Sequence, residues 1–270
     1  MRPSVWRWLC CAGAVTAVGA SACLQAGQAS AARVSLAGHN APTAQTAPAT
    51  TYVPPTTNLK FGDHGPAVRS VQKRLNQLGY YAGPADGQYG NDLEEAVWAF
   101  KEVQGLPING GSSVITRAFR HALINPRLPK ALVPKGGPGR VEVNQSIQVL
   151  VLYRHNQPHL ILHISSGGRY YFCDPPPHQA SCGYAITPDG NYKALWYYKG
   201  TLTVPLGYME NPVFFIGSAY AIHGGDAVPW YPASHGCIRI YDDVVTWFHT
   251  LVSLGTTHIY VRGKAPQYLS

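Results

Sequence analysis

Between residues 58 and 124, apolar positions recur at three- and four-residue steps, which is the spacing of short amphipathic helices. Pro66 and Gly79 are placed to begin and end a first helix, since proline fits the first turn and glycine the position after the last. A turn over residues 86–90 precedes a second helix, and a third is expected over residues 116–123. The predicted inward faces of the first two helices consist of Val68, Val71, Leu75 and Leu78, and of Leu93, Ala96, Val97 and Phe100.

Beyond residue 140 the apolar positions follow the period of strands. Residues 141–153 are dense in β-branched and aliphatic side chains, and the pattern continues over 160–164 after a turn at 155–158, which predicts a hairpin. Further short strands are expected around residue 170 and over residues 192–198, 201–204, 213–216 and 259–262.

One good helix is expected in this second part, from Asp242 to Leu254. Asp242 or Asp243 lies near its positive end, and Gly255 follows its last turn. The predicted fold class is therefore multidomain α+β: a small three-helix bundle, then a mostly β domain with one packed helix.

The first 31 residues have the features of an export signal. Arg2 and Arg7 precede an apolar run over residues 8–20, and Ala29–Ala31 supplies the small residues that a signal peptidase requires. An alternative is a lipid anchor, because Ala20–Cys23 resembles the sequence at which bacterial lipoproteins are acylated on the cysteine. An uncleaved membrane anchor is a third alternative, although the run is short for a span. The chain is expected to be secreted into the cell envelope, either freely or anchored through Cys23.

Composition places the linkers between these parts. Residues 32–57 are rich in Ala, Thr and Pro, which predicts a flexible spacer, and residues 125–140 form a Pro/Gly-punctuated linker. The expected divisions are thus a signal peptide at 1–31, a linker at 32–57, domains at 58–124 and 141–264, and a linker at 125–140.

Charge excludes one class of partner. The chain of 270 residues has a formal net charge of +8, but the Lys and Arg residues are scattered and form no block, so no nucleic acid partner is expected. No cofactor or metal is expected either, because there is no His-Glu-x-x-His helix and no second cysteine pair. The metal alternative would use His223, His235 and Cys237.

Three of the six cysteines lie outside the predicted export region. Cys173 and Cys182 bracket a Pro-rich loop and are close enough in sequence to close a disulfide in an oxidising compartment. Cys237 is then the unpaired thiol.

Two segments carry candidate chemistry: Tyr220–Gly225, which contains His223 and Gly224, and Ser234–Ile240, which contains Cys237. A thiol transfers acyl groups as the thiolate, and histidine is the base suited to that task near neutral pH. Gly236 permits a tight turn that would aim backbone N–H groups at one point, as an oxyanion hole requires. Taken singly, a buried cysteine and a hydrogen-bonded structural histidine are the ordinary alternatives.

The helical segment resembles the bacterial peptidoglycan-binding module. The resemblance rests on FGDHGPAVRSVQKRLNQLGYYAG, DGQYG, AVWAFKEVQGLPING and ITRAFRHAL, and it covers nearly all of residues 58–124. Lys101 departs from the pattern, since the family commonly has glutamine after this phenylalanine. The alternative is a generic three-helix domain. The resemblance implies that peptidoglycan is the partner of this segment.

The second part resembles the L,D-transpeptidases of the YkuD type. Their motif is a His-Gly pair followed, after a loop, by Ser/Thr-His-Gly-Cys-x-Arg/Asn, and this chain has His223–Gly224 and Ser234–Arg239. Ser165–Gly167 and Thr187–Tyr192 also match features of the family. The resemblance implies a YkuD-like β-sandwich. The insertion between Cys173 and Cys182 is unusual for the family.

The resemblance implies a role for each matching residue. Cys237 would be the nucleophile, His223 its base, and the carbonyl of Gly224 would orient His223. Backbone N–H groups of His235, Gly236 and Cys237 would surround the oxyanion. Ser234 and Arg239 would shape the cleft or bind a substrate carboxylate. The alternative for Arg239 is a structural ion pair with Asp242 or Asp243. Tyr208 and Tyr220 either line the cleft or, as we expect for both, pack in the core.

The implied reaction joins peptidoglycan stems. A donor tetrapeptide stem would form a thioester with Cys237 and release D-alanine, an acceptor stem amine would then take the acyl group, and carbapenem-type β-lactams would be inhibitors. One alternative is a wall-peptide cysteine hydrolase, an L,D-carboxypeptidase or amidase, although papain-like enzymes usually place the cysteine before the histidine. The other is a catalytically silent wall-binding protein.

Overall fold

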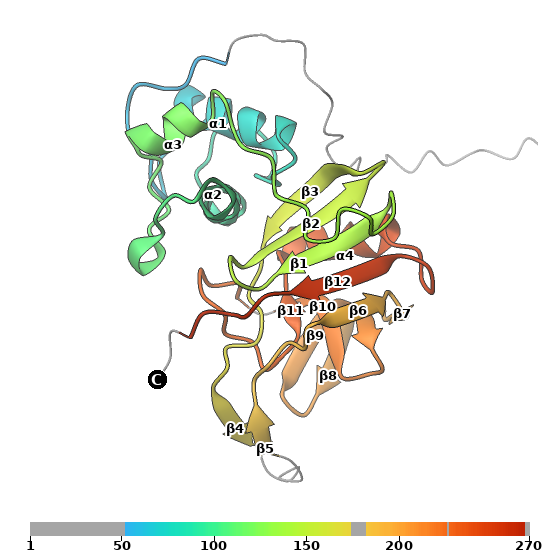
Figure 1. Ribbon diagram of the computed structural model, residues 1–270. Coiled ribbons are helices and arrows are strands. Elements are labelled where there is room, and N and C mark those ends of the chain that lie inside the picture. The colour runs from blue at the N-terminus through green and yellow to red at the C-terminus, as the bar shows by residue number, and fades with distance from the viewer. Residues whose placement is uncertain (1–51, 174–181, 226, 268–270) are drawn as a thin grey trace, which may run out of the picture. The chain divides into compact units, whose positions relative to one another are not determined.

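The structure is a computed structural model that describes residues 52–173, 182–225 and 227–267 (Figure 1). The predicted signal peptide at 1–31, with the alternative anchor Cys23, lies outside the described residues, as does most of the predicted linker at 32–57. Among the described residues, no helix is long and apolar enough to cross a membrane.

Three α-helices form the N-terminal part, as the sequence predicts. Pro66 occupies the first turn of α1, and Gly79 follows its end with a positive φ of 88°. The Thr116 side chain caps α3 by accepting a hydrogen bond from the Phe119 N–H. The helices are α1 (Pro66–Gln77), α2 (Asn91–Gln104) and α3 (Arg117–Ala122), with a 3₁₀ turn η1 (Asn109–Gly111) between the last two.

The predicted apolar faces meet in one core. Val68, Val71 and Leu75 of α1 are fully buried, as are Ala96 and Phe100 of α2. The Phe100 ring contacts the rings of Tyr80 and Phe119, with centroids 5.3 and 4.7 Å away. The helical part therefore depends on the side chains that the helical spacing selects.

The C-terminal part contains two larger sheets. The first has the order β3-β2-β1-β12-β6, in which only β1 and β12 are parallel neighbours. Its strands are β1 (Arg140–Asn144), β2 (Val149–Arg154), β3 (Gln157–His163), β6 (Gly190–Lys193) and β12 (His258–Arg262).

The second sheet has the order β11-β10-β9-β7, with β8 also paired to β9. Helix α4 (Asp242–Phe248) buries Val244, Val245 and Phe248 in the core shared by the two sheets. The strands are β7 (Trp196–Tyr197), β8 (Thr201–Val204), β9 (Gly207–Ile216), β10 (Tyr220–Gly224) and β11 (Ile238–Arg239). A two-stranded sheet pairs β4 (Tyr171–Cys173) with β5 (Cys182–Tyr184).

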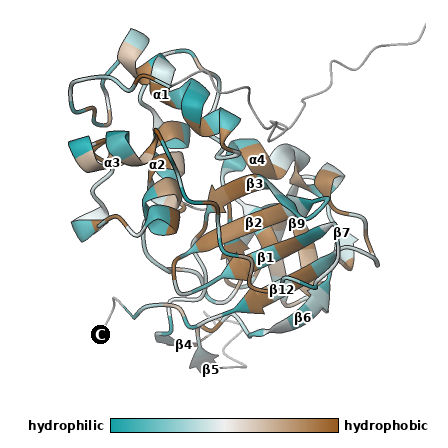
Figure 2. Ribbon diagram, turned by 45° about the horizontal axis from the view of Figure 1, so that its top comes forward, coloured by the Kyte–Doolittle hydropathy of each residue, from teal (hydrophilic) through white to brown (hydrophobic). Residues whose placement is uncertain are grey.

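Strands β1, β2 and β3 of the first sheet are largely buried on both faces, and Figure 2 shows them as mostly hydrophobic. Leu150 and Leu152 face the second sheet, whereas the alternating Val149, Val151 and Tyr153 belong to the core of the helices. This explains why residues 149–153 read as a continuous apolar run rather than an alternating one. The helical part and the β part thus share a hydrophobic contact.

Two expected elements differ from the structure. The apolar stretch 141–153 is two strands, because Gln145–Gln148 turns the chain and Gln148 adopts a positive φ of 48°. The helix expected over 242–254 ends as an α-helix at Phe248 and continues as the 3₁₀ turn η2 (His249–Leu251). Strands β5, β10 and β11 were not expected as separate elements, since strands of two to five residues carry little periodicity.

Two carboxylates meet between α2 and α4. Asp92 lies in the first turn of α2 and contacts Asp243 in the first turn of α4. Burial, and then the neighbouring charge and hydrogen bond of Asp243, raise the pKa of Asp92 from 3.8 to about 6.

We predict that Asp92→Asn raises the melting temperature at pH 7.5 and leaves it close to the wild-type value at pH 4. The folded protein binds the Asp92 proton more tightly than the unfolded chain, so wild-type stability falls as the pH rises from about 3.8 to about 6. Asparagine removes the charge that causes this loss. Circular-dichroism melts at the two pH values measure the difference.

Asp86→Asn is the matched control with the opposite sign. Hydrogen bonds from the Gln88 N–H and the Gln72 side chain lower the pKa of Asp86, so its substitution is expected to lower the melting temperature at pH 7.5. If Asp92→Asn also destabilises the protein at pH 7.5, the account of the Asp92–Asp243 contact is wrong.

Candidate active site

The candidate nucleophile and base lie on the same face of the second sheet. Strands β10 and β11 pair in parallel, with Ile222 opposite Ile238 and His223 opposite Arg239. Ile222 and Ile238 are fully buried in the core between the sheets. Because side chains alternate along strands, His223 and Cys237 project to the opposite face.

That face lines a cleft of about 450 Å³. Sequence analysis named several of its lining residues: His223, Ser234, His235, Gly236, Cys237 and Arg239. The opposite wall comes from the β8–β9 hairpin, and Phe172 of β4 closes one side. The hydrophobic pattern of the sequence does not reveal these walls, because most of their apolar residues are exposed or half-buried. The wall residues are Phe172, Val204, Pro205, Leu206, Tyr208 and the buried Met209.

His223 is oriented by its neighbour. Its Nδ1 lies 2.8 Å from the carbonyl oxygen of Gly224, and since a carbonyl only accepts, Nδ1 carries the hydrogen. Nε2 is then the nitrogen that can accept a proton. Gly224 leaves no room for a side chain, because a Cβ there would lie 2.6 Å from Val245 Cγ1 and 2.7 Å from Asp242 Oδ1.

A tight turn presents Cys237. The Ser234 hydroxyl accepts a hydrogen bond from the Gly236 N–H at 3.0 Å and donates to the Cys237 carbonyl. Gly236 has a φ of 150°, and a Cβ there would lie 2.7 Å from the Tyr220 ring. The glycine is therefore required both by conformation and by space.

The thiol of Cys237 is half-buried and unpaired. Its Sγ accepts the Ala221 N–H at 3.4 Å and lies 3.8 Å from the Ala219 carbonyl oxygen. Burial raises the pKa of the Cys237 thiol, while the Ala221 N–H and the positive charge of Arg239 oppose that rise. Those two groups thus favour the thiolate.

Two motifs noted in the sequence support the turn from behind. The Thr187 hydroxyl donates to the Gly236 carbonyl at 2.7 Å and accepts the Gly167 N–H at 2.9 Å. A Cβ on Gly167 would lie 2.6 Å from the Ala185 carbonyl, which accounts for a glycine at this position. Ser165–Gly167 and Thr187 therefore support the turn from outside the cleft lining.

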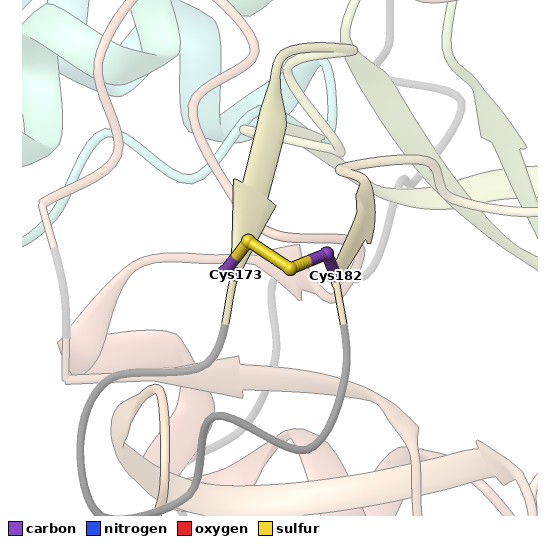
Figure 3. The surroundings of a disulfide bond; sticks show 2 residues. All are labelled: Cys173 and Cys182. Carbon is purple, nitrogen blue, oxygen red and sulfur yellow. A yellow bond between two sulfur atoms is a disulfide. The ribbon is translucent and has the colours of Figure 1, made fainter.

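A disulfide closes the β4–β5 hairpin beside the cleft (Figure 3). It joins Cys173 and Cys182, the pair predicted from the sequence. The adjacent Phe172 packs edge-on against the ring of His235, with centroids 4.7 Å apart, and Tyr170 packs against the same ring at 5.5 Å. The residues beside the disulfide thus contact His235, which precedes Gly236 in the sequence. The Pro-rich loop 174–181 lies outside the described residues.

Three predicted side-chain environments can be compared directly. Tyr208 and Tyr220 both line the cleft; 46% of Tyr208 is exposed, against the expected core packing, whereas Tyr220 also packs against the core between the sheets, as expected. Arg239 also lines the cleft and donates to the Ala227 carbonyl at 3.4 Å. The carboxylate of Asp242, one of its proposed partners, accepts the Gly225 N–H at 2.6 Å.

No group of three or more His, Cys, Asp or Glu side chains in the described part of the chain is arranged to hold a metal ion. His223, His235 and Cys237 all line the cleft, but they do not form such a group.

Two family models match parts of this chain. Residues 138–261 match the family model described as the L,D-transpeptidase catalytic domain of the YkuD family, and residues 64–114 match a putative peptidoglycan binding domain. A search of curated proteins finds no match. A solved L,D-transpeptidase from Xylanimonas cellulosilytica is 29% identical with a TM-score of 0.69, over 78% of this chain and 100% of that one. One from Stackebrandtia nassauensis is 17% identical with a TM-score of 0.45, over 79% and 99%.

We predict that Arg239→Gln shifts the titration of the Cys237 thiol to higher pH. The positive charge of Arg239 lowers the pKa of this thiol, so its removal leaves the opposing effect of burial larger. The rate of alkylation by iodoacetamide, measured against pH, reports the thiolate fraction.

Arg154→Gln is the control, since Arg154 is an exposed arginine at the end of β2, away from the cleft. Its alkylation profile should match the wild type. If the alkylation profile of Arg239→Gln is the same as that of the wild type, the charge of Arg239 does not lower the pKa of the Cys237 thiol, and this account is wrong.

Proposed function

We propose that this L,D-transpeptidase, whose YkuD-type catalytic domain follows a peptidoglycan-binding domain, cross-links peptidoglycan stem peptides through a thioester on Cys237. The observation that carries the proposal is the shared cleft: a turn that exposes Cys237 and a histidine whose Nδ1–H is held by the Gly224 carbonyl. This arrangement supplies a nucleophile, a base and an orienting group without a carboxylate.

In the acylation step, His223 Nε2 takes the proton of the Cys237 thiol, and the sulfur attacks the carbonyl of the third residue of a donor tetrapeptide. The peptide bond to the terminal D-alanine breaks, and His223 returns the proton to the departing amine. Backbone N–H groups of the turn stabilise the oxyanion. Since the Gly236 N–H already donates to Ser234, this contribution falls mainly to the N–H groups of His235 and Cys237.

In the second step, the side-chain amine of an acceptor stem attacks the thioester. His223 accepts the proton of the attacking amine and returns it to the sulfur, which restores the thiol. Arg239 stands in the cleft beside Cys237, where it favours the thiolate and can pair with a substrate carboxylate. Water in place of the amine would give hydrolysis, and the chemistry of the acyl-enzyme allows both outcomes.

The helical part is proposed to hold the enzyme on its polymeric substrate, and the protein is wall-associated by its two domains. Export to the envelope follows from the signal sequence proposed at residues 1–31, with Cys23 as the alternative lipid anchor. A disulfide between Cys173 and Cys182 fits an oxidising compartment outside the cytoplasm.

We predict that the purified protein converts a disaccharide-tetrapeptide into a cross-linked dimer and free D-alanine, as followed by mass spectrometry. Cys237→Ala should lower the rate by about 10³-fold or more, because the nucleophile is lost. His223→Ala should lower it by about 10²- to 10⁴-fold, because the general base is lost.

His121→Ala is the matched control, since His121 is an exposed histidine on α3, and it should turn over at the wild-type rate. Tripeptide without dimer would indicate a hydrolase instead. Full turnover by Cys237→Ala would end the proposal.

We also predict that carbapenem-type β-lactams acylate Cys237. Their strained carbonyl meets the same thiol, and ring opening leaves the drug attached as a thioester. Intact-protein mass spectrometry should show one added drug mass in the wild type and none in Cys237→Ala. A drug mass that persists in Cys237→Ala would assign the reaction to another group.

A further inference from the structure

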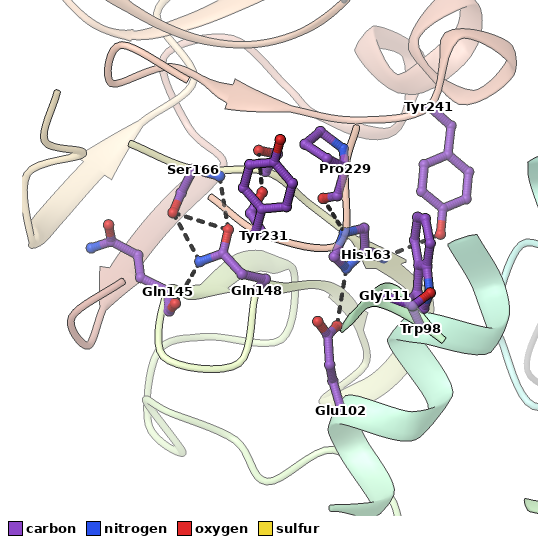
Figure 4. A network of polar contacts seen from close by, with 11 residues as sticks. Trp98, Glu102, Gly111, Gln145, Gln148, His163, Ser166, Pro229, Tyr231 and Tyr241 are labelled. Carbon is purple, nitrogen blue, oxygen red and sulfur yellow. Dashed lines mark hydrogen bonds and ion pairs between the residues drawn. The ribbon is translucent and has the colours of Figure 1, made fainter. Parts of the chain in front are cut away.

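One buried histidine joins three parts of the protein (Figure 4). His163 is the last residue of β3 and is fully buried. Its Nδ1 lies 3.1 Å from Glu102 Oε2 of α2, and its Nε2 lies 2.9 Å from the carbonyl oxygen of Pro229. The loop that contains Pro229 leads to the turn of the nucleophile. His163 therefore connects the helical part to the active-site loop.

The chemistry of these partners determines where hydrogens lie around the imidazole of His163. A carbonyl only accepts, so Nε2 must carry a hydrogen toward Pro229. One further proton then lies between Nδ1 and Glu102, either on the imidazole as an ion pair or on the carboxyl group as a neutral pair. In both cases the two contacts together need that proton, because a neutral imidazole beside an ionised Glu102 can donate to only one of its two acceptors, the carboxylate or the Pro229 carbonyl.

A second contact from the helical part reaches the next residue of the same loop. The Trp98 indole N–H donates to the Gly111 carbonyl at 3.0 Å, and the Trp98 ring packs edge-on against His163 with centroids 5.3 Å apart. Trp230 lies directly over Gly111, where a Cβ would be 2.3 Å from the indole. The helical part thus reaches the active-site loop indirectly at Pro229, through His163, and directly at Trp230.

The residues that follow His163 hold the rest of this loop. The Ser165 hydroxyl donates to the Tyr231 carbonyl and accepts the Ala233 N–H, both at 2.9 Å. The Ser234 N–H donates to the Ser166 carbonyl at 3.0 Å. Gln148 in turn accepts the Ser166 N–H at 2.9 Å. Hydrogen bonds at Pro229, Tyr231, Ala233 and Ser234 therefore hold this loop between His163 and the turn at Cys237, so the position of Pro229 is linked to that of the turn.

We propose that Glu102 and His163 are positioning residues of the active site: α2 holds the loop 227–233, and through it the Cys237 turn, in the reactive arrangement. The helical part then contributes to catalysis in addition to the polymer binding proposed above. The inference rests on the proposed function for its turnover readout, but the alkylation readout below does not depend on it.

The contact should also respond to pH. Burial raises the pKa of Glu102 to about 7, opposed by the charge and hydrogen bond of His163. The other ionisable groups that interact with Glu102 are the phenols of Tyr80 and Tyr241, and burial raises the pKa of both, so neither is charged near neutral pH. As the pH rises past about 7, the shared proton is lost, and His163 can then donate to only one of Glu102 and Pro229, so the link between α2 and the loop weakens.

Two substitutions at Glu102 separate positioning from general stability. Glu102→Ala removes the contact, and kcat should fall on the order of 10-fold or more, because small displacements of a nucleophile are costly. KM for the tetrapeptide and binding to isolated peptidoglycan should not change. Glu102→Gln keeps the contact, since its amide N–H can donate to Nδ1 without a shared proton. The kcat of Glu102→Gln should be within about twofold of the wild-type kcat at pH 6.5. The ratio of the two kcat values, variant over wild type, should rise toward pH 8.5, because the wild type loses the shared proton and the amide needs none.

Glu142→Ala is the matched control. Glu142 is a buried carboxylate of β1 in an ion pair with Arg140, and it also accepts the Leu132 and Val133 N–H groups; none of these partners belongs to the loop 227–233. This variant should melt at a lower temperature while kcat, measured well below that temperature, stays at the wild-type value.

Alkylation of Cys237 by iodoacetamide provides a readout that needs no transpeptidation. The rate constant of Glu102→Ala should differ from wild type at equal pH, whereas Glu102→Gln and Glu142→Ala should match it. If Glu102→Ala, folded at the assay temperature, keeps the wild-type kcat and alkylation rate, the positioning role is overturned. If the wild type lacks turnover but the alkylation rates differ as stated, the proposed function fails and the positioning role stands.

Discussion

The parallel pairing of β10 with β11 is the constraint on which the candidate site depends. Ile222 and Ile238 are register partners and both are fully buried, so neither strand can shift by one residue without moving an isoleucine out of the core. The same register sends His223 and Cys237 to the cleft. Hydrophobic burial on one face of this strand pair therefore determines which side chains reach the cleft on the other face.

Much of the fold was predictable because the helices and the long strands have clear periodicity. The faces of α1 and α2, the Pro66 start and the predicted disulfide pair all appear in the structure. The short strands β10 and β11 were not predictable from pattern, and the turn at Gln148 was hidden inside an apolar run. In that run, burial on both faces removes the alternation that marks strand boundaries.

The site was less predictable than the fold where it depends on contacts across the sequence. The motif residues around Cys237 could be named from the chain alone, because they are contiguous. The cleft walls at Phe172 and Met209, and the support from Thr187 and His163, come from distant segments whose side chains carry no local signal. Their roles follow only from the hydrogen bonds and ring contacts that the fold creates.

The apolar contact between α2 and the first sheet limits how the chain can be divided. Val149, Val151, Tyr153 and Ile161 are covered by the helical core, and they would form a contiguous exposed apolar patch on a catalytic fragment expressed without the helices. Such a fragment would tend to self-associate or require detergent. The boundary between the two matched segments is therefore a poor place to cut this protein for recombinant production.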